Sequence, residues 1–223
     1  MGTDRAANDD GKSASPRDYV RDPQEIYRQS FAIIETEAGL DRLPHDIAPV
    51  ARRMIHACGM VDLIDDLDHS ADAGAKGRQA LAAGAPVLCD VRMAAAGIMA
   101  NRLPTKNEIL VGLDRTEVDE LAKCRETTRS AAGMEAMADR FDGAVVLIGN
   151  APTALFRLLE LVAEGAARPA LVLGIPVGFV GAAESKAALA ESDLPFITVH
   201  GRRGGSAIAA AALNALLVEG NAQ

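Results

Sequence analysis

Short apolar runs alternate with helical segments along the chain, and this alternation predicts an α/β fold with a mainly parallel sheet. The clearest strands are AVVLIG (144–149), ALVLG (170–174) and PFITV (195–199). Each is continuous and rich in β-branched residues, as expected of a strand buried on both faces. PVLCD (86–90) and NEILVGL (107–113) complete a predicted sheet of five strands.

Helical periodicity fills the segments between and before these strands. Two amphipathic helices are expected first, over 23–38 and 45–58, each ended by a glycine. Residues 60–83 also look helical, with a loop around 72–77. The remaining helices are expected over 91–100, 115–124, 129–140, from Pro152 to Gly165, and over 206–217.

The domain organisation is simple. Residues 1–18 are polar and poor in apolar side chains, which predicts a disordered tail, and residues 19–223 are expected to form one domain.

Composition excludes several classes of protein. A net charge of −8, no tryptophan and 3% aromatic residues argue against nucleic acid and anionic membranes as partners. Neither a transmembrane run nor a signal peptide is present, so a cytoplasmic location is expected. The three cysteines are too widely spaced for a zinc site, and no metal site is predicted. The glycine-rich nucleotide motifs are absent as well.

Glycine-rich and polar segments follow three of the predicted strands. In a parallel sheet, segments 149–153, 176–186 and 200–206 should line one crevice beyond the carboxyl ends of the strands. The turn 201–206 fits an anion site or a simple chain reversal equally well. Glu184, Ser185 and Lys186 are either functional or an exposed first turn. Thr128 and Arg129 fit an anion site, or a helix that Thr128 caps.

The second predicted helix carries the strongest candidate for proton transfer. Arg53 and His56 are spaced i, i+3 and lie on one side of that helix. His56 is in the last turn, where the helix dipole favours the imidazolium ion by about 0.3–1 kcal/mol. An imidazolium beside a carboxylate-binding arginine is a workable acid catalyst. The alternative is a solvated charged face.

Four stretches, in order, resemble the precorrin-8X methylmutase family of corrin (vitamin B12) biosynthesis. They are SFAII (30–34), RMIHACG (53–59), GNAPTALF (149–156) and GIPVGFVGAAESK (174–186). LCD (88–90), TRS (128–130) and the segment 201–206 fit the same pattern, and the similarity covers about residues 20–218.

The resemblance implies a specific isomerase. Its members move a methyl group from C-11 to C-12 of precorrin-8X to give hydrogenobyrinic acid, without a cofactor. The family fold is a three-layer α/β/α sandwich, usually a homodimer with the active site near the subunit interface. The family's catalytic histidine falls on His56. Transient contact with neighbouring pathway enzymes is a further expectation. The residues expected to bind substrate are Ser30, Arg53, Thr128, Arg129, Asn150, Pro152, Thr153, Gly178, Gly181, Glu184, Ser185, Lys186, Arg202, Gly205 and Ser206.

Three other functions stay open. One is the cobalt-precorrin-8 methylmutase of the anaerobic branch. Another is a tetrapyrrole carrier that binds the product without turnover. A generic α/β nucleotide-binding protein is the third, and the missing phosphate-loop motifs argue against it.

Overall fold

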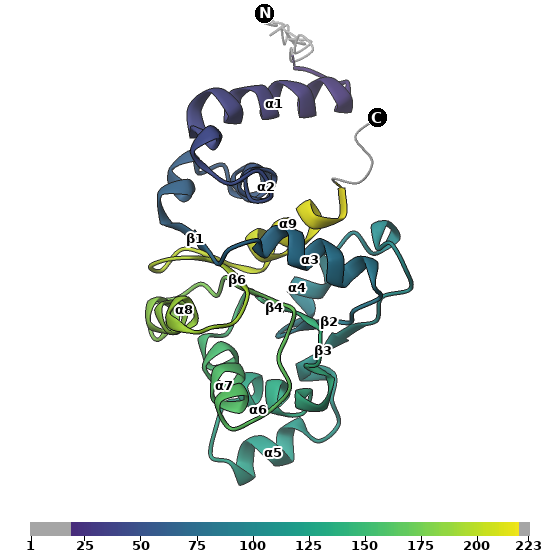
Figure 1. Ribbon diagram of the computed structural model, residues 1–223, viewed down its shortest axis with the longest axis vertical. Coiled ribbons are helices and arrows are strands. Elements are labelled where there is room, and N and C mark those ends of the chain that lie inside the picture. The colour runs from purple at the N-terminus through teal and green to yellow at the C-terminus, as the bar shows by residue number, and fades with distance from the viewer. Residues whose placement is uncertain (1–18, 219–223) are drawn as a thin grey trace, which may run out of the picture.

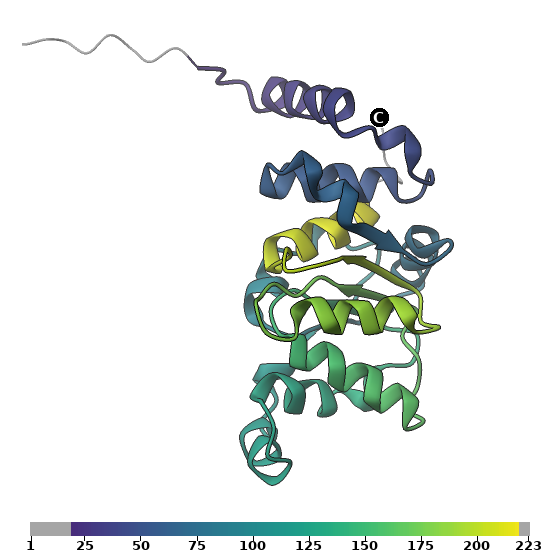
Figure 2. The ribbon, with the colours of Figure 1, turned by 90° about the vertical axis from the view of Figure 1, so that its left-hand side faces the viewer.

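The computed structural model describes residues 19–218, so the predicted tail over 1–18 and the last five residues lie outside the described part of the chain (Figures 1 and 2). The helices are α1 (Pro23–Ala38), α2 (Ala48–Cys58), α3 (Ala73–Ala82), α4 (Arg92–Ala96), α5 (Val118–Cys124), α6 (Arg129–Glu135), α7 (Pro152–Ala163), α8 (Ala182–Glu191) and α9 (Ser206–Val218). The strands are β1 (Leu67–His69), β2 (Val87–Cys89), β3 (Ile109–Val111), β4 (Val145–Ile148), β5 (Leu171–Gly174) and β6 (Phe196–Val199). None of the described helices is both long and apolar enough to cross a membrane.

The predicted α/β fold with a mostly parallel sheet is confirmed, but the sheet has six strands in the order β1-β6-β5-β4-β2-β3. The added strand, β1, lies in the stretch 60–83 that was predicted to be helical, and it pairs antiparallel with β6 (Leu67 opposite Val199). A short 3-10 helix, η2 (Val61–Asp66), precedes it. β1 has only three residues, which is too short for a recognisable alternation of apolar and polar side chains, and its partner β6 lies far away in the sequence. Tertiary pairing alone therefore defines β1.

Helices cover both faces of the sheet and make three layers (Figure 1). On one face, α2, α3 and α4 surround α9, and α1 lies outside α2 as an extra outer element (Figure 2). On the other face, α7 packs between α6 and α8, and α5 packs on α6. All four residues of β4, β5 and β6 are buried, as continuous apolar strands between two helical layers should be.

One contact links the end of α2 to the carboxyl edge of the sheet. Arg203, in the loop after β6, forms ion pairs with Asp62 and Asp66 of η2, which directly follows α2. The backbone amide of His200 also donates to the carbonyl of Asp66. These bonds place the last turn of α2 beside the loop 201–205.

Candidate active site

His56 is held in a defined orientation between α1 and α2. Its Nδ1 atom forms a 2.9 Å hydrogen bond with Oγ of Ser30. The ring stacks near Tyr27, at 5.4 Å between centroids, and meets Phe31 edge-on at 5.2 Å. Gly59, at φ 69°, ends α2 three residues later, so His56 lies in the last turn of this helix. With Nδ1 engaged, Nε2 is the nitrogen available to a ligand.

A small cavity lies beside this ring. It has a volume of about 220 Å³, and its lining includes Ser30, His56 and Glu37. A larger hollow of about 750 Å³ shares Glu37, Gly59 and Val61 with it. The half-buried histidine therefore borders open space on the side of η2.

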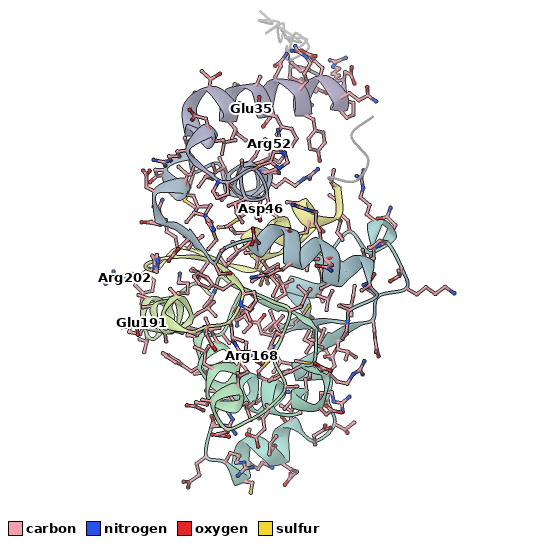
Figure 3. All side chains as sticks on the ribbon, in the orientation of Figure 1. Glu35, Asp46, Arg52, Arg168, Glu191 and Arg202 are labelled. Atoms are coloured by element: carbon pink, nitrogen blue, oxygen red, sulfur yellow. The ribbon has the colours of Figure 1, made fainter. Side chains whose placement is uncertain are left out.

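Two arginines of α2 frame the aromatic side of the site. The guanidinium groups of Arg52 and Arg53 lie over the ring of Phe31, at 5.1 and 5.9 Å from its centroid. Arg52 also forms a 2.7 Å salt bridge with Glu35 of α1, and both residues are labelled where these helices cross (Figure 3). The structure thus brings Ser30, Arg53 and His56 together.

A second group of predicted residues gathers at the start of α6 and α7. Thr128 caps α6 by accepting from the amide of Ala131, at 3.2 Å. Its hydroxyl also lies 2.7 Å from the hydroxyl of Thr153, in the first turn of α7. Pro152 is the first residue of α7, and Asn150 is exposed in the turn before it. The helix cap by Thr128, one of the two interpretations that the sequence left open, is present, and a hydrogen bond joins Thr128 to Thr153 of the turn 149–153.

Arg129 lies away from His56 within one chain. It starts α6 and forms an exposed 2.7 Å salt bridge with Asp119 of α5. Because α6 and α2 cover opposite faces of the sheet, the two residues belong to different layers (Figure 1).

Arg202 and the loop before α8 form an exposed projection at the carboxyl edge. The guanidinium of Arg202 lies 5.4 Å from the ring centroid of Phe179, and this side chain is at the outer surface (Figure 3). Phe179 is 84% exposed and Val180 89% exposed. Gly178 donates its amide to the carbonyl of Arg202, and Gly181 (φ 78°) begins α8.

The first turn of α8 divides the predicted residues between surface and interior. Glu184 is exposed, whereas Ser185 and Lys186 are fully buried. The Ser185 hydroxyl donates to the carbonyl of Ala182, and Nζ of Lys186 donates to the carbonyl of Arg203 at 2.6 Å. Burial lowers the pKa of Lys186 to about 8, although Asp66 opposes that shift. In this chain the buried Lys186 ammonium group therefore stabilises the loop 201–205 by binding one of its backbone carbonyls.

Gly205 and Ser206 join the same edge to the turn before α7. The amide of Gly205 donates to the carbonyl of Ile175. Ser206 begins α9 and is buried. A Cβ atom on Gly149 would lie only 2.6 Å from Cα of Ser206, so a glycine is required for this close approach.

The predicted site residues leave out one buried carboxyl group, Asp90, although the motif LCD (88–90) contains it. It is 2% exposed, and its carboxylate accepts the amides of Gly149, Asn150 and Ala151. Burial raises its pKa, and these backbone hydrogen bonds oppose the rise. The anion-binding position at the start of α7, which a nucleotide phosphate or a substrate carboxylate would use, is therefore filled by the protein itself. Its place directly after a buried strand was the available signal.

A family model for precorrin-8X methylmutase matches residues 25–219. The chain belongs to this family. It is 56% identical over 204 residues to the precorrin-8X methylmutase of Pseudomonas aeruginosa, which covers 91% of this chain and 98% of that protein. The cobalt-precorrin-8 methylmutase of Priestia megaterium is 41% identical over 197 residues, covering 88% of each chain. A crystal structure of precorrin-8x methyl mutase from Thermus thermophilus superposes with a TM-score of 0.79 at 42% identity, covering 87% of this chain and 94% of that one.

Proposed function

We propose that this protein is a precorrin-8X methylmutase, an isomerase that moves a methyl group from C-11 to C-12 of precorrin-8X to give hydrogenobyrinic acid, with His56 as the proton-transfer residue. The observation that carries the assignment of His56 is its bond to Ser30 beside the cavity between α1 and η2. Family membership supports the reaction.

The ring of His56 is suited to give and recover one proton. As an imidazolium, it donates from Nδ1 to Oγ of Ser30, and Nε2–H remains for a nitrogen of the macrocycle. Protonation withdraws electrons from the ring system, which favours breaking the C-11–methyl bond as the C-12–methyl bond forms. The proton then returns to Nε2, so the reaction is a net isomerisation.

The substrate's acidic side chains need cationic partners, although the whole protein carries a charge of −8. Arg53 lies one helical turn from His56, and Arg202 is exposed at the carboxyl edge. Arginine binds carboxylates through paired hydrogen bonds, which also fixes the orientation of the ligand. We therefore assign these two residues to substrate carboxylates.

Metal-free precorrin-8X is the preferred substrate in this proposal, because the Pseudomonas relative is more similar than the cobalt-precorrin-8 relative. Purified protein mixed with precorrin-8X should give the visible spectrum of hydrogenobyrinic acid, and this product should co-elute with the protein in gel filtration. Faster conversion of cobalt-precorrin-8 would reverse the choice of substrate. Retention of pigment without any turnover would instead indicate a carrier.

We infer that a second copy of the chain completes the site. Arg129 and His56 lie on opposite faces of one sheet, so a single chain does not bring them together. Apolar side chains exposed at Val177, Phe179 and Val180 supply a surface for such contact, because exposed apolar clusters are typical of interfaces.

The paired variant Phe179→Asp, Val180→Asp should be monomeric and lose most of its turnover, since two charges would have to be buried at the contact. Sedimentation velocity and product formation measure both effects. Met93→Asp is the matched control, because Met93 is 74% exposed but lies elsewhere, on α4. A wild-type protein that is monomeric and fully active would contradict the shared site.

A further inference from the structure

Asp90 joins two segments that are far apart in the sequence. It follows β2, and Oδ1 accepts the amide of Gly149 at 3.1 Å. Oδ2 accepts the amides of Asn150 and Ala151, each at 2.8 Å. The carboxylate thus binds three successive N–H groups of one turn.

This arrangement compensates for the burial of a charge. A buried carboxylate is costly unless hydrogen bonds replace its water. The first amides of a helix have no intrahelical partner, and Ala151, the N-cap of α7, has no side chain that can satisfy one. Asp90, directly after the neighbouring strand β2, accepts the N-cap amide of Ala151, and the helix dipole there also favours a negative charge.

The turn is also fixed from its other side. Gly149 lies against the start of α9, where even one added methyl group would meet the backbone of Ser206. Asp90 and α9 therefore hold the turn from two directions, which restricts the conformational freedom that Gly149 would otherwise have.

The turn determines where predicted substrate-binding groups lie. Asn150 is exposed within it, and Thr153 is hydrogen-bonded to Thr128, the cap of α6. A shift of the turn would move Asn150 and disturb the hydrogen bond that connects α7 to the start of α6.

We propose that Asp90 is a positioning residue for substrate binding, whose carboxylate fixes the turn 149–153 and so sets the place of Asn150 and of the Thr128–Thr153 pair. This inference rests on the function proposed above. It assigns Asp90 no contact with the substrate.

Asn107 provides a control in which the donor and acceptor roles of side chain and backbone are exchanged. Asn107 is also buried, and its Nδ2 donates to the carbonyls of Leu81 and Ala85, in the segment that precedes β2. Asp90→Asn places an amide donor against backbone donors, whereas Asn107→Asp places an acceptor against backbone acceptors. Both changes preserve side-chain shape and mismatch a buried hydrogen-bond set, but only the first is at the carboxyl edge.

Three measurements on wild type and both variants test the proposal: hydrogen exchange at amides 149–151, the KM for precorrin-8X, and the Kd for hydrogenobyrinic acid. Asp90→Asn should speed exchange at these amides and raise KM and Kd about ten- to a hundredfold, as small misplacements of binding groups do. Asn107→Asp should leave all three within about twofold, even with a comparable loss of thermal stability.

Native exchange at 149–151 in Asp90→Asn, or a rise in KM no larger than in Asn107→Asp, would overturn the proposal. Failure of the proposed function is recognised separately, because wild type itself would then neither convert precorrin-8X nor bind hydrogenobyrinic acid. The hydrogen-exchange measurement tests whether Asp90 holds the turn in place, whether or not the proposed function is correct.

Discussion

His56→Asn should lower kcat for precorrin-8X about 10²- to 10⁴-fold, the usual contribution of one acid–base group. Asparagine retains a polar atom near the position of Nδ1, so it can keep the contact with Ser30 at 2.9 Å in the native chain. It has no group that transfers a proton at neutral pH. The affinity of His56→Asn for hydrogenobyrinic acid should therefore change little, whereas its kcat should fall by this factor.

Single-turnover absorbance at saturating substrate measures the chemical step directly. His45→Asn is the matched control, since His45 is exposed and lies before α2, outside the cavity beside His56. A His56→Asn protein with native turnover at full occupancy would remove His56 from the mechanism. A selective loss of binding would make it a substrate ligand instead.

Raising the pH should stabilise wild type more than Lys186→Met. Folding lowers the pKa of Lys186 from 10.5 to about 8, mainly through burial. Between these values the unfolded chain holds a proton that the folded chain has released, so the free energy of unfolding rises with pH. This group contributes up to about 3 kcal/mol across the window, and below it the full cost of burying the ammonium ion remains.

Urea unfolding at pH 7 and pH 10 measures this difference, because the pH dependence of all other groups is shared by wild type and variant. Lys76→Met serves as control, since Lys76 is exposed on α3 and should retain the wild-type pH dependence. Parallel pH dependence of wild type and Lys186→Met would mean that Lys186 has an ordinary pKa in the folded chain.

The buried strands were predictable because each carries its own signal. β4, β5 and β6 are continuous apolar segments, and the intervening helices have regular apolar spacing and clear ends such as Pro152. β1 has no such signal, since its three half-buried residues become a strand only by pairing with β6.

The features of the candidate site likewise separate into those that local sequence predicts and those that depend on tertiary contacts. The i, i+3 spacing of Arg53 and His56 fixes their common side of α2, because helix geometry is local. The Ser30 bond to His56, by contrast, depends on how α1 crosses α2. Lys186 shares the inward face of α8 with Ala182, Ser185 and Leu189, and no local rule orients that weakly amphipathic helix.

By itself, the sequence determined the α/β class, the five parallel strands, the family and the helix that carries the candidate acid, because strand composition, helix periodicity and ordered motifs are properties of neighbouring residues. Tertiary structure alone decided the sixth strand, the Ser30–His56 bond, the burial of Lys186 and the filling of the α7 anion position by Asp90. Each of these depends on contacts between segments distant in the chain, whose energies exist only once the layers have packed.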